Sequence, residues 1–167
     1  MQRLILMRHA EAERAAASGR DRDRALSAHG RADATAMGRA LAAHGARPDL
    51  ALISPAVRTQ QTWDLVHDAL GDVQIRRDEP LYNGSSEVLR RAVEAVEDEA
   101  GCLLVIAHNP GVHLLAVEYL IESAASPSVL DRMSGGFAPG AAALFTVDVA
   151  GRPTFEGFLQ PRDLAAA

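Results

Sequence analysis

Short apolar runs recur along the chain and are separated by longer amphipathic stretches. Strand-length apolar runs are typical of buried β-strands, whereas apolar positions spaced three or four apart indicate helices. The runs that predict strands lie at residues 4–7, 50–53, 73–76, 103–107, 143–149 and 154–159. Because strands and helices alternate over most of the chain, the pattern predicts an α/β fold. We expect a three-layer α/β/α sandwich with a mainly parallel sheet.

Capping residues and glycines set the expected bounds of the first two helices. Ser27 can cap a helix that runs through about residue 43 and is ended by Gly45. Ser54-Pro55 combines an N-cap residue with proline, which is favoured at the first helical position. That pair predicts a second helix, which continues to about residue 70.

Two more helices follow the same signals. Ser85 or Ser86 can cap a helix that ends near residue 101, and Asn109-Pro110 predicts the start of a helix that includes residues 112–120. The last two strands flank Gly151-Arg152-Pro153, which indicates a hairpin. The segments expected to be irregular are 11–25 and 123–140, and the tail after Pro161 is short and Ala-rich.

Composition narrows the classes of protein to consider. A chain of 167 residues suits a single domain over residues 1–167, and the 48% hydrophobic fraction is ordinary for a globular protein. The net charge of -5 argues against a general binder of nucleic acid or membrane surfaces. Cys102 is the single cysteine, so no disulfide framework is expected. Without a recognisable signal peptide, the expectation is a soluble cytoplasmic protein.

All seventeen basic residues are arginine, which bears on any anion site. Such a site must use arginine, histidine or backbone N–H groups. The planar guanidinium group is well suited to phosphate because it can donate two hydrogen bonds at once.

Polar residues directly follow three of the predicted strands. The first ends at Arg8-His9, the second at Ser54 with Arg58 in the following helix, and the fourth at His108-Asn109. The carboxyl ends of parallel strands lie at one edge of a sheet, where open α/β proteins bind ligands. Helix N-termini at the same edge favour anions. The sequence therefore predicts a phosphate site.

The residue types at this edge suit phosphoryl transfer without a metal or another cofactor. A neutral histidine is a nucleophile that can form a covalent phosphoenzyme, and arginines can stabilise the charge on the phosphoryl oxygens. A metal site is disfavoured because His108 and His113 do not have the i, i+4 spacing that places two ligands on one helix face. The residue six positions after Cys102 is His108 rather than the arginine of a cysteine phosphatase.

The motifs resemble those of the histidine phosphatase superfamily, the phosphoglycerate-mutase-like enzymes, in order along nearly the whole chain. Arg8-His9-Ala10 resembles the Arg-His-Gly signature, and the 26–31, 54–62 and 105–111 segments resemble three further motifs. The short chain and its His-Asn-Pro segment look most like the SixA-type phosphohistidine phosphatases. The resemblance implies a phosphoglycerate-mutase-like fold.

The resemblance also implies a role for each matched residue. His9 would be the nucleophile that becomes phosphorylated, and the phosphoryl group would be held by Arg8, Arg58 and His108. Ser54 is a candidate for orienting His9, and Asn109 for lining the pocket. Ala10 and Ala107 replace glycines that are usual in the family, so the backbone at Ala10 must avoid a positive φ or accept strain.

The proton donor is not marked by a clear motif. Glu79 and Glu87 lie in the corresponding region and are candidates, although both also suit a solvated surface. A general acid matters most when the leaving group is poor. An absent acid would therefore fit a phosphoramidate, as in phosphohistidine, better than a sugar phosphate.

The expected function is hydrolysis of a phosphomonoester or phosphoramidate, foremost phosphohistidine in a protein. The partners would be a phosphorylated protein or a small phosphate ester, with no nucleic acid and no membrane. Three alternatives stay open: a small-molecule phosphomonoesterase, phosphoglycerate-mutase chemistry, and a non-catalytic phosphoprotein-binding module. The sequence does not indicate the oligomeric state or how loops 11–25 and 123–140 select a substrate.

Overall fold

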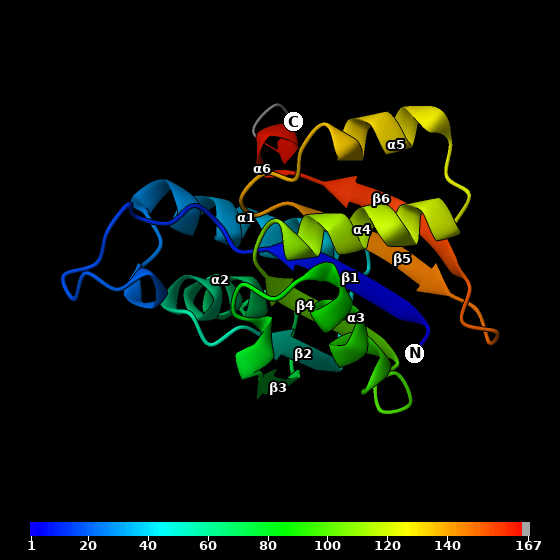
Figure 1. Ribbon diagram of the computed structural model, residues 1–167, viewed down its shortest axis with the longest axis horizontal. Coiled ribbons are helices and arrows are strands. Elements are labelled where there is room, and N and C mark those ends of the chain that lie inside the picture. The colour runs from blue at the N-terminus through cyan, green and yellow to red at the C-terminus, as the bar shows by residue number, and fades with distance from the viewer. Residues whose placement is uncertain (165–167) are drawn as a thin grey trace.

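A six-stranded sheet forms the centre of the molecule, with helices packed on both of its faces (Figure 1). The computed structural model describes residues 1–164. The strands are β1 (Arg3–Arg8), β2 (Leu50–Ile53), β3 (Gln74–Arg77), β4 (Cys102–Ala107), β5 (Ala142–Val147) and β6 (Pro153–Leu159). The helices are η1 (Asp21–Asp23), α1 (Ala28–Ala43), α2 (Val57–His67), η2 (Glu79–Leu81), α3 (Ser86–Glu94), α4 (Gly111–Glu122), α5 (Pro127–Ser134) and α6 (Pro161–Leu164).

The strand order across the sheet is β3-β2-β4-β1-β5-β6. The strands β3, β2, β4 and β1 pair in parallel, and β5 and β6 continue the sheet antiparallel as a hairpin. The predicted three-layer α/β/α architecture with a mainly parallel sheet is therefore confirmed. β1 and β4 lie at the centre, so the sequences that follow them emerge side by side.

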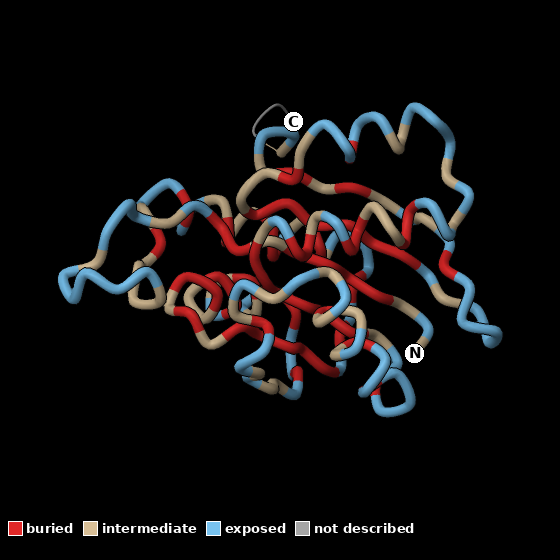
Figure 2. The backbone as a smooth tube through the Cα atoms, in the orientation of Figure 1, coloured by how far each residue is buried: buried red, intermediate tan, exposed pale blue. Residues whose placement is uncertain are grey.

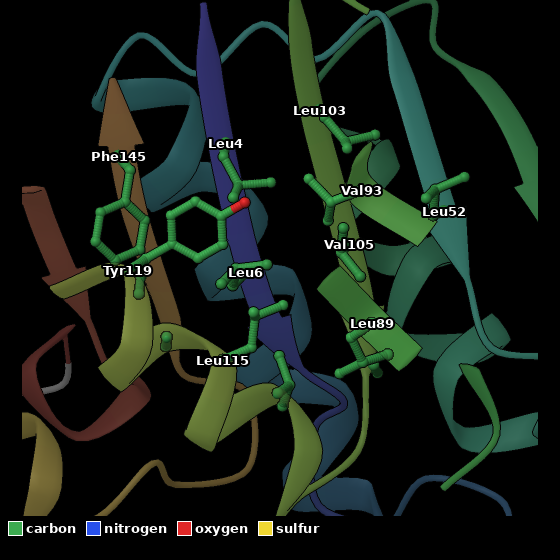
Figure 3. Close-up of a cluster of buried hydrophobic side chains, with 14 of the residues drawn as sticks. Leu4, Leu6, Leu52, Leu89, Val93, Leu103, Val105, Leu115, Tyr119 and Phe145 are labelled. Carbon is green, nitrogen blue, oxygen red and sulfur yellow. The ribbon is translucent and has the colours of Figure 1, made fainter. Parts of the chain in front are cut away.

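Alternate side chains of the central strands enter two separate cores. Leu4 and Leu6 of β1 pack with α3, α4 and α5 on one face, in the core drawn in Figure 3. Ile5 and Met7 pack with α1 and α2 on the other face. All four side chains are fully buried, and the central strands form the buried band in Figure 2. This burial on both faces explains why the strands are continuous apolar runs.

The predicted helix starts are correct at two positions and wrong at two. Ser27 and Ser85 cap α1 and α3, with their side chains accepting hydrogen bonds from backbone N–H groups. Ser54 is not the N-cap residue of α2, because the helix begins after Ala56; the Ser54 hydroxyl oxygen accepts from the N–H of Ala56 at 3.3 Å and from His108 in the site described below. Asn109 does not cap α4, because its side-chain amide donates to a neighbouring loop and Pro110 is the N-cap residue.

Two segments differ from the prediction in length or type. α3 ends at Glu94 rather than near residue 101. The segment expected to be irregular at 123–140 contains α5, which begins at Ser126-Pro127 and buries Met133. The loop 11–25 is mostly irregular as predicted, apart from η1 and a bridge between Ala12 and Leu26.

The loop after η2 packs closely on the start of α4. A side chain at Gly111 would meet the carbonyl oxygen of Gly84 at 2.0 Å, so only glycine allows this approach. The contact holds the segment with Tyr82 beside the carboxyl ends of the strands. Among residues 1–164, no helix is long and apolar enough to cross a membrane.

Candidate active site

Sheet register brings the ends of β1, β2 and β4 to one edge. Arg8 is opposite Ala107, and Ile53 is opposite Ile106. Backbone hydrogen bonding between the strands continues past their ends. The N–H of His9 donates to the carbonyl oxygen of Ala107 at 3.1 Å, and the N–H of Ser54 donates to that of Ile106 at 3.2 Å. The side chains predicted to converge from three strand ends therefore lie together.

His9 is held as one neutral tautomer. Its Nδ1 lies 2.7 Å from the carbonyl oxygen of Ala10, and its Nε2 lies 3.3 Å from Nε of Arg58. A carbonyl oxygen can only accept, so Nδ1 carries the proton and Nε2 presents its lone pair. Burial, opposed by the Ala10 bond and supported by the nearby arginines, lowers the pKa of His9 to about 4. The imidazole is thus uncharged at neutral pH, and its Nε2 can act as a nucleophile.

His108 faces His9 with both ring nitrogens engaged. The ring centroids are 5.1 Å apart. Nδ1 accepts from Arg58 at 3.2 Å, so Nε2 carries the proton and donates to the hydroxyl oxygen of Ser54 at 2.6 Å. Burial lowers the pKa of His108 to about 3, with smaller contributions from His9 and Arg58. Ser54 therefore orients His108, and the expectation that it orients His9 is wrong.

Arg58 joins the two histidines. It lies in the first turn of α2, is 4% exposed, and donates from Nε to His9 and from a terminal nitrogen to His108. Its outer side binds the carbonyl oxygen of Asp21 at 2.9 Å and the carboxylate at 3.1 Å. The expected place of Arg58 in the site matches this geometry.

Arg8 approaches the same edge from the end of β1. One terminal nitrogen donates to the carbonyl oxygen of Phe137 at 3.1 Å. Burial lowers the pKa of Arg8, and a smaller contribution comes from the neighbouring Arg58 guanidinium, so two positive charges lie near each other. Such a concentration of charge is stabilised by a bound anion.

Asp21 and Tyr82 belong to the site but were not predicted from the sequence. The Tyr82 hydroxyl donates to the Asp21 carboxylate at 2.6 Å, and the Tyr82 ring lies edge-on to His108 with centroids 5.5 Å apart. Hydrogen bonds from Tyr82 and Arg24, together with Arg58, hold the pKa of Asp21 well below its usual range. Asp21 is therefore a charged partner of Arg58 rather than a proton donor.

The two candidate proton donors are both paired with arginines on the surface. Glu79 binds Arg22, and this interaction lowers the pKa of the Glu79 carboxyl group. Glu87 binds Arg91 one turn along α3, with both side chains more than two-thirds exposed. Neither carboxylate has a hydrogen bond to His9, Arg58 or His108 within residues 1–164.

Alanine is accommodated where glycine is usual in the family. Ala10 is fully buried and is not among the residues with positive φ, so it carries no such strain. Its N–H donates to the Thr62 hydroxyl at 3.0 Å, which anchors the turn after His9 to α2. Ala107 is the last residue of β4 and keeps ordinary strand pairing with Arg8.

Asn109 shares a hydrogen-bond acceptor with Arg8. Its side-chain amide donates to the Phe137 carbonyl oxygen at 3.0 Å, the same oxygen that Arg8 binds. Asn109 and Arg8 both line a cavity of about 590 Å³ beside the site. No cluster of three or more histidine, cysteine or acidic side chains suited to a metal ion is found among residues 1–164.

Comparison with known families matches residues 4–100 to the histidine phosphatase superfamily (branch 1). The matched region contains Arg8, His9 and Arg58. An uncharacterized protein of Mycobacterium tuberculosis, Rv1276c, is 32% identical over 127 residues, which cover 76% of this chain and 78% of that protein. An uncharacterized protein of Mycobacterium leprae, ML1117, is 27% identical over 132 residues, which cover 79% of this chain and 78% of that protein.

Solved structures with the same fold include three SixA proteins. A proposed phosphohistidine phosphatase SixA from Agrobacterium tumefaciens superimposes with a TM-score of 0.83 at 28% identity, covering 96% of this chain and 99% of that chain. The corresponding protein from Nakamurella multipartitia gives a TM-score of 0.81 at 31% identity, covering 96% of each chain. A protein histidine phosphatase SixA complexed with tungstate gives 0.75 at 26% identity, covering 97% of this chain and 99% of that chain.

Proposed function

Because the chain belongs to the histidine phosphatase superfamily, we propose that it hydrolyses phosphohistidine in proteins through a covalent intermediate on His9. The SixA proteins that share its fold support this substrate class. Tungstate, bound by one of them, is a tetrahedral oxyanion like phosphate. The observation that carries the proposal is the state of His9, whose unprotonated Nε2 faces Arg58 while Nδ1 is fixed by Ala10.

In the first step, Nε2 of His9 attacks the phosphorus atom of the substrate. The bond from phosphorus to the substrate imidazole nitrogen breaks as the bond to His9 forms, and the departing imidazole takes a proton from water. Arg8 and Arg58 can donate hydrogen bonds to the phosphoryl oxygens, which spread negative charge in the transition state, and His108 holds Arg58 through Nδ1. Water then attacks phosphorus, releases inorganic phosphate and restores His9.

The leaving group favours phosphohistidine over a phosphate ester. An alkoxide leaving group needs a general acid. The carboxylate that contacts Arg58, that of Asp21, is held charged by Tyr82, Arg24 and Arg58. Glu79 and Glu87 are paired with arginines at the surface. A phosphoramidate leaves more readily and does not depend on such an acid.

A rate comparison across substrate classes tests the proposed substrate. A phosphohistidine peptide, a phosphoserine peptide of the same sequence and a small phosphate ester are compared by kcat/KM for phosphate release. We expect the phosphohistidine peptide to exceed the phosphoserine peptide by about 100-fold, which corresponds to ~2.7 kcal/mol of transition-state energy. Equal or inverted rates would favour a small-molecule phosphomonoesterase.

Two further measurements test the catalytic claim. Mass spectrometry after incubation with a phosphodonor is expected to find phosphate on His9, and stoichiometric binding without turnover would instead favour a phosphoprotein-binding module. Full activity is expected after treatment with EDTA, because Arg8 and Arg58 supply the positive charge that a metal would otherwise provide. Loss of activity that added metal restores would contradict this.

A further inference from the structure

The cavity beside Arg8 lies next to the two histidines but has its own lining. It has a volume of about 590 Å³, within the range of small-ligand sites. Its walls come from the end of β1, the end of β4, the segment after α5 and the start of α6. The polar side chains that line it are Arg8, Asn109, His113, Arg132, Gln160 and Arg162.

Unpaired polar atoms gather around this cavity. Among residues 1–164, the buried side-chain atoms without a hydrogen-bond partner are Nε of Arg8, Oδ1 of Asn109 and Nε2 of Gln160. All three residues line the cavity, and Gln160 is only 2% exposed. An unpaired buried polar atom is costly, so proteins rarely keep one without a purpose. Three residues of this lining therefore retain hydrogen-bonding capacity that a ligand could use.

The rest of the lining is fixed in shape. His113 hydrogen-bonds to the carbonyl oxygen of Met133 at 2.7 Å and stacks on Phe137, with ring centroids 5.7 Å apart. The Phe137 carbonyl oxygen accepts from both Arg8 and Asn109. These contacts tie α4, α5 and the two strand ends together, so the cavity does not depend on a mobile side chain for its form.

Positive charge surrounds the cavity. Arg8 lies at its inner end, and Arg132 and Arg162 lie at its outer rim, where their side chains are 52% and 72% exposed. Asp163 pairs with Arg132 at 2.8 Å and approaches Arg162 only to 3.9 Å. Three guanidinium groups line the cavity, and Asp163 contacts only the two at the rim, so the cavity favours an anionic ligand.

From this lining we propose that the cavity binds an acidic residue that flanks the phosphorylated histidine of a protein substrate. The inference rests on the proposed function, because it assigns the cavity to the same substrate. Arg132 and Arg162 suit a carboxylate. The unpaired Gln160 donor and the unpaired Asn109 acceptor suit the C=O and N–H of a peptide backbone, which a small phosphate ester lacks. Arg8 borders both the phosphoryl site and the cavity, so one substrate segment can reach both.

Matched peptides test this proposal on the intact protein. Two phosphohistidine peptides differ only in carrying glutamate or glutamine on both sides of the phosphohistidine. We expect kcat/KM for the glutamate peptide to be about tenfold higher at low salt, and this ratio to fall at high salt. In the double variant Arg132→Gln/Arg162→Gln, the ratio is expected to fall to about two or less. Arg152→Gln, which removes the same charge from the distant β5–β6 hairpin, is expected to keep both the basal activity and the ratio.

Two further single variants guard against a loss of folding in the double variant. Arg132 also lies 5.4 Å from the centre of the Phe158 ring, so the more exposed Arg162→Gln is measured alone and is expected to lower the ratio about threefold. Gln160→Leu removes the unpaired donor and is expected to raise KM for both peptides more than it lowers kcat. A ratio near one in the wild type, or a ratio retained in the double variant, would overturn the proposal.

A second set of substrates distinguishes failure of the proposed function from failure of the cavity assignment. If phosphohistidine peptides are not hydrolysed, the glutamate and glutamine pair is repeated with phosphoserine peptides, which still report on the cavity. Two small substrates, 3-phosphoglycerate and glycerol 3-phosphate, complete the comparison. A carboxylate preference for these small esters but not for peptides would reject the peptide assignment.

Discussion

The ends of β1 and β4 present two histidines that look alike in the sequence and differ in the structure. Both follow a fully buried parallel strand, and both are nearly inaccessible to solvent. His9 is fixed through Nδ1 by a backbone carbonyl oxygen, which leaves Nε2 facing a single guanidinium group. His108 has both nitrogens engaged, one by Ser54 and the other by Arg58.

This difference in hydrogen bonding indicates that the two histidine rings have different roles in the reaction. A nucleophile needs a lone pair that substrate can reach, and only a weak 3.3 Å contact covers Nε2 of His9. His108 carries its proton on the nitrogen that donates to Ser54 at 2.6 Å, so its ring is oriented by a stronger bond. We therefore propose nucleophilic attack for His9, and for His108 the positioning of Arg58, which stabilises the phosphoryl group.

The largest predicted effect separates the two histidines directly. His9→Ala removes the attacking atom and is expected to abolish turnover and the covalent phosphoenzyme. His108→Ala removes the ring that positions Arg58 and is expected to lower kcat by about 10²–10³-fold while leaving a detectable phosphoenzyme. Single-turnover kinetics with mass spectrometry measures both. Wild-type hydrolysis by His9→Ala, or a phosphoenzyme on another residue in that variant, would reverse the assignment.

Arg58→Ala has the next largest predicted effect, because this side chain contacts both histidines. Loss of one preorganised donor is expected to cost about 2–4 kcal/mol of transition-state stabilisation, measured as kcat/KM. Arg91→Ala is the matched control, since Arg91 is exposed on α3 and pairs only with Glu87 there. An unchanged kcat/KM in Arg58→Ala would remove this residue from the proposed site.

Sequence reasoning reached the strand ends because apolar runs and polar residues that follow them are local patterns. Parallel pairing places the carboxyl ends of β1, β2 and β4 at one edge, which made the convergence of Arg8, His9 and His108 predictable, whereas the strand order came only from the structure. Asp21 was missed because it lies in an Arg- and Asp-rich run that is typical of solvated loops. Only the fold brings this run against Arg58 and Tyr82.

The wrong helix starts have a related cause. Ser54 and Asn109 both have the local signature of N-cap residues, but each side chain finds a partner from a distant part of the chain. Local propensity does not register such competition. The same two residues therefore mark the site more clearly than they mark helix ends. α5 was missed because the surrounding glycine, proline and serine residues outweighed its short amphipathic pattern.

The lowered pKa values predict a smaller effect on stability. The unfolded chain binds protons at histidine near pH 6.5, whereas the pKa of His9 is about 4 and that of His108 is about 3 in the folded protein. Between these values the unfolded state binds more protons, so the free energy of unfolding falls as the pH is lowered from about 6.5 to 4. Each histidine contributes a slope of up to about 1.4 kcal/mol per pH unit.

Urea denaturation of the wild type and of His9→Gln at pH 7.5 and pH 5.0 measures this slope. Carboxylates titrate alike in the two proteins, so the difference between the two pH responses isolates His9. We expect the wild type to lose about 2 kcal/mol more than the variant over this range. Equal losses of unfolding free energy in the two proteins would show that the fold does not hold His9 neutral. The proposed difference between His9 and His108 would then have no support.

The smallest predicted effect concerns the hydrogen bond from His108 to Ser54. Ser54→Ala leaves the Nε2 proton of His108 without its fully buried acceptor and frees the ring to turn. We expect a loss of about fivefold to tenfold in kcat with little change in KM, equivalent to ~1–1.4 kcal/mol and in the range of one neutral hydrogen bond.

Ser85→Ala is the control, because Ser85 caps α3 and its loss costs stability without touching either histidine. Ser54→Thr, which keeps a hydroxyl group, is expected to recover part of the loss. If Ser54→Ala and Ser85→Ala lower kcat equally, the hydrogen bond supports the fold alone, and the firm orientation of His108 would have no part in catalysis.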